Sequence, residues 1–333
     1  MAANLTQFGN DLYTGARSVK FVGSRKIWFG ITAVLILLSV ALPIIRGGFV
    51  FGIEFRGGSE FQVADVVELA ENRDEVQMLA GETVESVVAD SSPRVTVVGA
   101  NGLRIQTAQL TDADTSAVQQ ALIATFETEE VTASFIGPSW GADITSAAIR
   151  ALIVFVVLAG IVMALYFRTW KMSVAAIVSL ANVMVITAGV YGAFGLEITP
   201  SAVIGFLTIL GYSLYDTVVV FDKVRENTSE DGPESRRSFA ESVNLAANQT
   251  LVRSINTGVV AALPVAAILV IAVALLGAGS LLDIALSLFI GIVIGTLSTI
   301  FIAAPFYSLL RENEPDIKKQ ADRLAVSRAE ASR

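Results

Sequence analysis

The stretch 201–227, SAVIGFLTILGYSLYDTVVVFDKVREN, places one carboxylic acid inside an apolar run that is long enough to cross a lipid bilayer. The run ends at Phe221, and Asp216 lies five residues before that end, between Leu214 and Val218. An unpaired carboxylate near the middle of a membrane span costs about 2.5–3.5 kcal/mol on insertion scales. We therefore expect Asp216 to face the interior of a helix bundle or a water-filled cavity.

The composition of the whole chain is that of an integral membrane protein. Hydrophobic residues make up 53% of the 333 residues and charged residues only 16%, whereas a soluble domain carries about 25% charged residues. The absence of cysteine and histidine excludes disulfides, thiolate metal sites and histidine-based acid–base chemistry. The formal net charge of −8 argues against nucleic acid as a partner. With no nucleotide-binding motif and no nucleophile–base constellation, we expect no cofactor, no metal, no catalytic residues and no conventional enzyme.

Six apolar runs are long enough to span about 30 Å of hydrocarbon at 1.5 Å per residue. They cover approximately 27–45, 148–167, 172–194, 201–221, 255–276 and 284–309. The first run is followed by Pro43 and Arg46 and not by a small-residue cleavage site, so we interpret it as an uncleaved anchor. The chain shows no internal repeat of the kind usual in transporters, which suggests that the other half of a transporter is a separate polypeptide.

The basic residues predict the orientation of these spans. Lys and Arg gather in the segment 1–26, in the loop 222–254 and in the tail 311–333, whereas the short loops around Glu197 and 280–283 hold none. Loops rich in Lys and Arg stay in the cytoplasm. We therefore expect a multi-pass protein of the inner (cytoplasmic) membrane with both termini in the cytoplasm.

The long insert 46–147 between the first two spans then lies outside the cytoplasm. Alternation in EFQVADVV (60–67), a hairpin signal in RVTVVGANGLRIQTA (94–108) and a helix cap at Thr111 indicate short strands and helices. Their order, β-α-β-β-α-β, is the ferredoxin-like split pattern. We expect a small external α+β domain that serves as a binding or lever module.

A turn at Gly57–Gly58 is expected to join this domain to the first span, with Glu54 and Arg56 beside it in solvent. The chain then divides into a cytoplasmic segment (1–26), the first transmembrane helix (27–45), the external domain (46–147), the five-helix remainder of the membrane domain (148–310) and a cytoplasmic tail (311–333).

Asp216 shares a helical stripe with Gly205, Thr208 and Tyr212. The small and polar character of this stripe suits a buried seam better than a lipid-facing surface. A carboxyl group there is a candidate proton carrier, because burial and an approaching cation have opposite effects on its affinity for a proton. Two other interpretations stay open: a carboxylate that is permanently paired inside the bundle, and one that is hydrated at the cytoplasmic boundary.

Three further features of the membrane domain have two interpretations each. Arg253, just before the fifth apolar run, is the natural counter-charge for Asp216, although its charge alone favours an ordinary cytoplasmic anchor. Asn182 in the third run is more typical of a hydrogen bond between helices than of a pathway.

Small residues recur every four positions in the sixth run and form a close-packing face, either within the bundle or towards a partner. They are Ser287, Gly291, Gly295, Thr299 and Ala303.

Four motifs resemble the SecD/SecF family of protein-export membrane proteins, within the RND transporter superfamily. They are FGIEFRGGSEF (51–61), FIGPSWGADI (135–144), ILGYSLYDTVVVFDKVREN (209–227) and TLVRSINT (250–257). With the six-span topology, the resemblance covers about 20–310.

The resemblance implies that Asp216 and Arg253 belong to a proton pathway. Thr208, Tyr212, Tyr215 and Asn182 are candidates for the pathway or for the packing around it. The chain departs from the family in two places. Asn182-Val183 stands where a His-Asp pair is common, which argues against a proton relay through the third span, and Tyr215 stands where Asn is common.

The resemblance also implies a subunit of the Sec protein-export machinery. Such a subunit pairs with SecD in the lipid bilayer, acts on preprotein after the SecYEG channel and uses the proton-motive force to move its external domain. Accessory membrane subunits are further candidate partners. Two alternatives stay open. A half-size RND-type proton-coupled exporter of lipids or small molecules needs a second large external insert, for which the loops 195–200 and 277–283 are short. A non-conducting structural subunit would tolerate Asn in place of Asp216.

Overall fold

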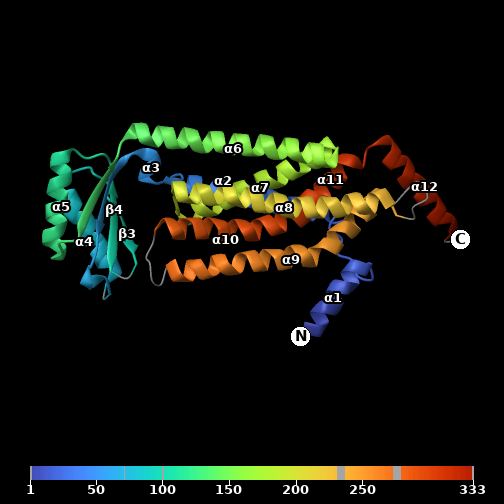
Figure 1. The fold of residues 1–333 in the computed structure, drawn as a ribbon, viewed down its shortest axis with the longest axis horizontal. Coiled ribbons are helices and arrows are strands. Elements are labelled where there is room, and N and C mark those ends of the chain that lie inside the picture. Colours follow the sequence, from blue (N-terminus) through green and yellow to red (C-terminus); the bar gives the residue numbers. More distant parts are fainter. Residues whose placement is uncertain (1, 71, 100, 231–236, 273–278, 332–333) are drawn as a thin grey trace.

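The computed structural model describes residues 2–70, 72–99, 101–230, 237–272 and 279–331. Within them, six helical segments are long and apolar enough to cross a membrane, and they form an elongated bundle with a small α/β domain at one end (Figure 1). The segments are α2 (Arg25–Ile45), α6 (Pro138–Phe167), α7 (Trp170–Phe194), α8 (Pro200–Glu230), α9 (Phe239–Ile271) and the continuous pair α10 (Ser280–Ser298) and α11 (Ala304–Arg311). The expected class, an α-helical membrane protein with six spans, is confirmed.

Several helices extend well beyond the apolar runs. α9 begins at Phe239, after a capping box in which Glu241 N donates to Ser238 Oγ (3.3 Å) and Ser238 N donates to the Glu241 carboxylate (2.8 Å). The expected end of the fifth span, 273–276, lies outside the described residues. Two further helices, α1 (Ala2–Thr14) and α12 (Pro315–Ala331), lie at the end of the bundle opposite the α/β domain (Figure 1).

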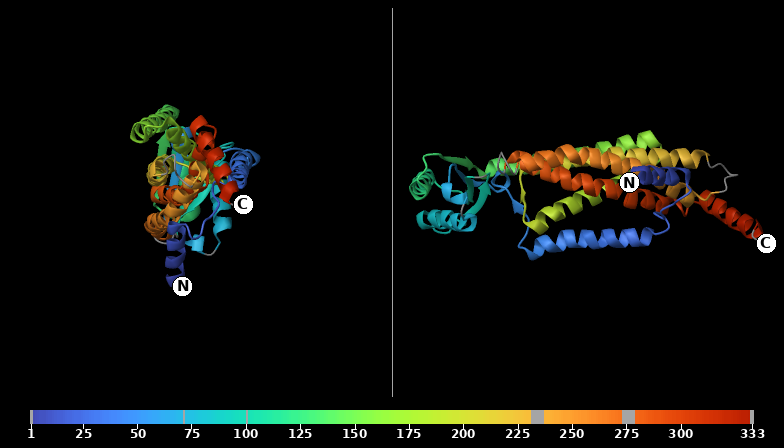
Figure 2. Two further views of the ribbon diagram at one scale, coloured as in Figure 1. Left: turned by 90° about the vertical axis from the view of Figure 1, so that its right-hand side faces the viewer. Right: turned by 90° about the horizontal axis from the view of Figure 1, so that it is seen from below.

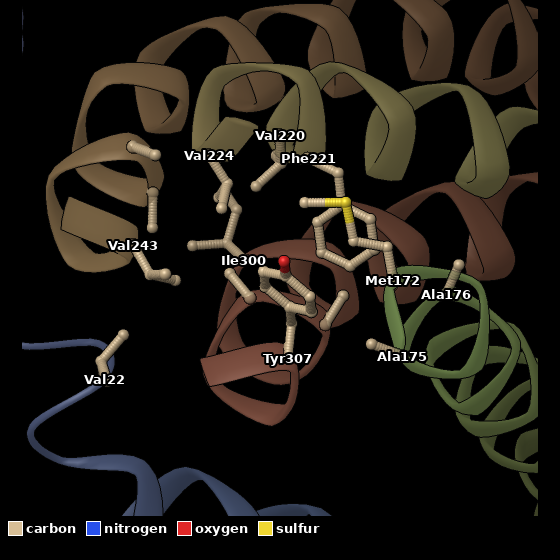
Figure 3. Packing of buried hydrophobic residues seen from close by; sticks show 14 of the residues in the cluster. Val22, Met172, Ala175, Ala176, Val220, Phe221, Val224, Val243, Ile300 and Tyr307 are labelled. Atoms are coloured by element: carbon tan, nitrogen blue, oxygen red, sulfur yellow. The ribbon is translucent and has the colours of Figure 1, made fainter. Parts of the chain in front are cut away.

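Helices α7, α8 and α10–α11 form the inside of the bundle. In their most apolar stretches 56%, 44% and 50% of the residues are buried, against 11% in each of α2, α6 and α9. The largest buried apolar cluster includes Phe221 of α8 and Tyr307 of α11, whose ring centroids are 5.5 Å apart, together with Met172 of α7 and Val243 of α9 (Figure 3). Helix α2 runs along the edge of the bundle (Figure 2). The outer helices therefore leave broad apolar faces for lipid or for a partner chain.

The small residues of α10 pack against α8 of the same chain. Gly291 lies against Ile209, and a β-carbon at Gly291 would collide with that side chain. At Gly295 a β-carbon would come within 3.3 Å of the Ser213 Cβ. The close-packing face expected in the sixth span therefore lies within the bundle at these two positions and does not face a partner.

The α/β domain is a four-stranded antiparallel sheet with two helices. Its elements are β2 (Gly58–Val63), a 3₁₀ turn (Val67–Ala70), α4 (Arg73–Val87), β3 (Arg94–Val98), β4 (Gly102–Thr107), α5 (Asp112–Phe126) and β5 (Val131–Ile136). The strand order is β3-β4-β2-β5, with Phe61 opposite both Ile105 and Ala133. The Thr111 hydroxyl accepts a hydrogen bond from Asp114 N (3.2 Å) and caps α5 as predicted. The expected ferredoxin-like α+β arrangement is thereby confirmed.

Two short strands and one helical turn join this domain to the bundle. β1 (Val50–Phe51) follows α2 and pairs in parallel with β6 (Glu197–Ile198), which directly precedes α8. The turn α3 (Ile53–Arg56) follows β1. Gly58 then has φ +148°, and a β-carbon there would collide with the Thr107 carbonyl oxygen, so the turn predicted at this position requires glycine.

The contact between α10 and α8 generates a prediction about stability. Gly291→Leu forces a large side chain into the space of Ile209, and overpacking of this kind costs about 1–3 kcal/mol. We expect a lower thermal unfolding midpoint for the purified chain in detergent. Gly30→Leu on α2 is the matched control, because nothing lies within 4 Å of a β-carbon at that position. Equal midpoints for the two variants would show that α8 and α10 leave room for a side chain at position 291.

Candidate functional site

Asp216 lies inside the bundle, as its sequence context predicts. Its side chain is 3% exposed. The Ser254 hydroxyl of α9 donates a hydrogen bond of 2.8 Å to Oδ1. Oδ2 is buried and has no hydrogen-bond partner of normal geometry among the described residues. At 1.5 Å per residue, Asp216 lies about 24 Å along the axis of α8 from Pro200, which is less than the hydrocarbon thickness of about 30 Å and nearer to its far side.

Hydroxyl groups from three helices surround this carboxyl group. Thr299, at the end of α10, is close enough to interact with it and lies 3.4 Å from the Thr217 hydroxyl of α8, oxygen to oxygen. Tyr212, one turn before Asp216, is half-buried, and its hydroxyl has no hydrogen-bond partner of normal geometry among the described residues. Asp216 therefore has neighbours that can accept or donate a proton, and among the described residues no cation is paired with it.

The sixth span changes its helical geometry at the same depth. The residues Thr299–Ala303 form a π-helical turn between α10 and α11. Such turns insert one extra residue into a helix and are frequent at functional sites. Here Ser298 bonds to α7, whereas the next residue, Thr299, faces α8. The π turn thus lies beside the carboxyl group of Asp216.

Arg253 does not meet Asp216. Its side chain is exposed and forms no ion pair within the described residues, whereas its neighbour Ser254 is fully buried against Asp216. Successive residues of a helix point about 100° apart, which separates these two side chains. The expected contact between Arg253 and Asp216 is therefore wrong for the chain by itself. Arg253 lies on the same turn of α9 as Ser254, so its backbone stands at the depth of Asp216.

The other candidate residues divide between surface and interior. Tyr215 is 63% exposed. Thr208 is exposed and donates only to the Ile204 carbonyl of its own helix (2.7 Å). The stripe that the sequence suggests is thus buried at Gly205 and Asp216 but open at Thr208.

Asn182 joins two helices. Its Nδ2 donates to Ser298 Oγ of α10 (3.0 Å), and Ser179 of α7 shares the same hydroxyl at 3.0 Å. Asn182 also lines a mainly apolar cavity of about 280 Å³ between α2, α7 and α10, together with Trp28 and Phe301. This geometry is the interhelical hydrogen bond that the residue type favours.

A second group of carboxylates lies at the joint with the α/β domain. Glu54 and Glu197 each bury a carboxylate oxygen that has no hydrogen-bond partner in the described part of the chain. Burial raises the pKa of Glu54, and the carboxylates of Glu197 and Glu60 raise it further, while a backbone hydrogen bond and Arg104 lower it. Glu54 is therefore not solvated as expected, whereas Arg56 is exposed. Nowhere in the described ranges do three acidic side chains converge in the manner of a metal site.

Sequence reasoning missed Ser254, Thr299 and the π turn. Ser254 lies in the motif TLVRSINT (250–257), but nothing in the sequence marks a serine beside an arginine as the partner of a carboxyl group. Thr299 is part of the small-residue repeat, which indicates packing and gives no sign of a contact with a carboxyl group. A π turn has no signature in the apolar pattern of this span.

Comparisons with known proteins identify the family. The sequence profile described as "Protein export membrane protein SecD/SecF, C-terminal" matches residues 117–313. The chain is 39% identical to the protein translocase subunit SecF of Mycobacterium tuberculosis, over 98% of this chain and 74% of that protein. It is 40% identical to the SecF subunit of Streptomyces coelicolor, over 99% of this chain and 87% of that protein.

A solved structure has the same fold. The crystal structure of SecDF from Thermus thermophilus, a translocon-associated membrane protein, superposes with a TM-score of 0.75 at 27% identity. The match covers 89% of this chain and 39% of the SecDF chain, so the present chain corresponds to less than half of that protein. The profile match and the near full-length relatives agree with the four motifs and the six spans, and the chain belongs to the SecD/SecF family of protein-export membrane proteins.

Proposed function

We propose that this multi-pass membrane protein is the SecF-type subunit of the Sec protein-export machinery, and that proton binding at Asp216 drives movement of its external domain. The observation that carries the proton role is a carboxyl group, 3% exposed, inside a membrane span, with one hydroxyl donor and no paired cation in the described residues. Ionisable groups in such positions mark proton and ion pathways. The hydroxyls of Tyr212, Thr217 and Thr299 supply neighbours for proton transfer.

The energy available at this site is sufficient for the task. A proton that crosses the whole membrane potential releases about 2.3 kcal/mol per 100 mV. Since 1.4 kcal/mol changes an equilibrium constant tenfold, one proton can shift a two-state equilibrium of the protein by more than a factor of ten at that potential.

The exposure of Arg253 supports a partner chain. A guanidinium group at the depth of Asp216 is costly in lipid, and charged groups inside membranes pair with one another. We propose that Arg253 pairs with a carboxylate of SecD, and that the exposed Tyr215 and Thr208 lie towards the same partner. The SecDF protein of Thermus thermophilus, in which this chain matches 39% of the length, offers a precedent for such an arrangement. The preprotein and SecYEG complete the proposed assembly.

The joint supplies a route from Asp216 to the external domain. β6 directly precedes α8, and its partner β1 lies between α2 and the domain. A shift of α8 along or about its axis would therefore act on β1, and through α3 on β2 of the external sheet. The domain is attached at its other end to α6, an outer helix of the bundle.

The first prediction concerns proton coupling. Asp216→Asn is nearly isosteric and removes a costly charge, so the variant should insert and assemble normally. It should lose the part of preprotein export that an uncoupler abolishes in the wild type. Asp222→Asn is the matched control, because Asp222 lies on the same helix with an exposed side chain. Export into membrane vesicles, with and without uncoupler, is the measurement. Full uncoupler-sensitive export by Asp216→Asn would assign a purely structural role to the residue.

The second prediction concerns the partner. Arg253→Gln should leave the thermal midpoint of the isolated chain unchanged, because the side chain has no ion pair in the described residues. It should reduce the recovery of SecD in a pull-down from membranes in mild detergent by roughly tenfold, because a polar contact between membrane helices contributes about 1–2 kcal/mol. The control is Arg225→Gln, because Arg225 is also an exposed arginine but lies on α8. Normal recovery of SecD with Arg253→Gln would remove Arg253 from the interface.

The third prediction concerns orientation. The chain has no cysteine, so single cysteines can report on sidedness. Ala117→Cys on α5 should react with a membrane-impermeant maleimide added to intact spheroplasts, because the α/β domain is external. Lys318→Cys on α12 should react only after the membrane is opened. Both side chains are exposed in the structure. Labelling of Lys318→Cys in intact spheroplasts would contradict the proposed topology.

A further inference from the structure

A basic cavity lies at the end of the bundle opposite the α/β domain. Its volume is about 690 Å³, and it is bounded by the segment between α1 and α2, by the first turns of α9 and by α12. Figure 1 shows these elements together at that end of the molecule. The basic side chains that line it are Lys20, Arg25, Lys26, Arg237 and Arg328, against the two carboxylates of Glu241 and Glu312. Positive charge therefore exceeds negative charge in the lining.

Both carboxylates already have partners. Arg328 donates to the two oxygens of Glu241 at 2.9 and 2.8 Å, and Arg25 forms an ion pair with Glu312. These pairs tie α12 to α9, and α2 to the segment after α11. Lys20 is exposed, as is Lys26, and neither lysine has an ion pair in the ranges that the structure describes. Their ammonium groups remain available to an anion.

The cavity adjoins the start of a membrane span. Arg25 is the first residue of α2, a span with a mean hydropathy of 2.4, so the cavity lies where the hydrocarbon begins. Helix α1 lies on the same side and packs on α9 through Gly9, whose β-carbon position is 3.4 Å from Val252. It leaves Phe8 38% exposed and Tyr13 55% exposed. Exposed aromatic side chains are typical of the interface between headgroups and hydrocarbon.

We propose that this cavity binds the phosphate-bearing headgroup of an anionic phospholipid. Lys20 and Lys26 supply the unpaired positive charge, and the two ion pairs hold the surrounding walls in place. Basic pockets between the ends of membrane helices recognise anionic headgroups in this way. A lipid is favoured over a soluble anion because the site borders the start of a span and a helix with exposed aromatic side chains. Bound there, the lipid bridges α2, α9 and α12 beside the membrane.

The test measures lipid binding to the purified full-length chain in detergent by native mass spectrometry, with phosphatidylglycerol and phosphatidylcholine as probes. The double variant Lys20→Gln/Lys26→Gln should bind phosphatidylglycerol roughly 10- to 30-fold more weakly than the wild type, because each lysine near a membrane surface contributes about 1 kcal/mol. Its weak binding of phosphatidylcholine should not change. Lys318→Gln/Lys319→Gln is the matched control, because these exposed lysines of α12 do not line the cavity.

Three results would overturn the proposal. The first is an unchanged preference for phosphatidylglycerol in Lys20→Gln/Lys26→Gln. The second is an equal loss in the control variant, which would assign the effect to net charge and not to the cavity. The third is displacement of phosphatidylglycerol by inorganic phosphate at millimolar concentration, which would make the cavity a site for a soluble anion. Thermal midpoints of both variants, measured alongside, establish that the chains compared are folded.

Discussion

A carboxylate can only accept hydrogen bonds, and this property of Asp216 constrains how the helices around it pack. Five buried threonines inside the helices of the bundle satisfy their hydroxyls within their own helices, each donating to the carbonyl oxygen four residues earlier. This holds for Thr187, Thr217, Thr250, Thr296 and Thr299. Asp216 cannot do so, because backbone N–H groups inside a helix are already engaged. The donor must therefore be a side chain, and it is the Ser254 hydroxyl of α9, which fixes how α9 faces α8 at this depth.

Much of the architecture follows from local sequence patterns. Apolar runs gave the six spans, and alternation, a hairpin signal and the Thr111 cap gave the external α+β domain, because each pattern acts over a few residues. The surroundings of Asp216 could not be predicted in this way. Arg253 and Ser254 are neighbours in sequence, and only the rotation of α9 decides which of them reaches the carboxyl group. Spacing also shows that Gly291 packs closely, but not whether its neighbour belongs to the same chain.

Pairing between strands that are far apart in the sequence explains why Glu54 is half-buried and not solvated as the sequence suggests. Glu54 lies between the pairs Gly47–Gly48 and Gly57–Gly58 in the sequence and resembles a solvated turn residue. It is half-buried because β1 pairs with β6, a strand far along the chain, and this brings the Glu197 carboxylate beside it. No window of sequence around Glu54 contains that information. The basic cavity could not be predicted for the same reason, because its walls come from three distant segments of the chain, 14–26, 237–245 and 312–328.

The parallel pairing of β1 and β6 has a mechanical consequence. It involves two residues on each strand, with a further hydrogen bond of 2.9 Å from Gly52 N to the Ile198 carbonyl. Each such bond contributes a net of about 0.5–1.5 kcal/mol, far less than the bundle needs for its own stability. The junction is therefore held by much less energy than the helices and the sheet on either side of it. Under the proposed function, one proton supplies about 2.3 kcal/mol per 100 mV. This energy is comparable with that of the few hydrogen bonds between β1 and β6, so it is enough to remake the connection between the bundle and the α/β domain.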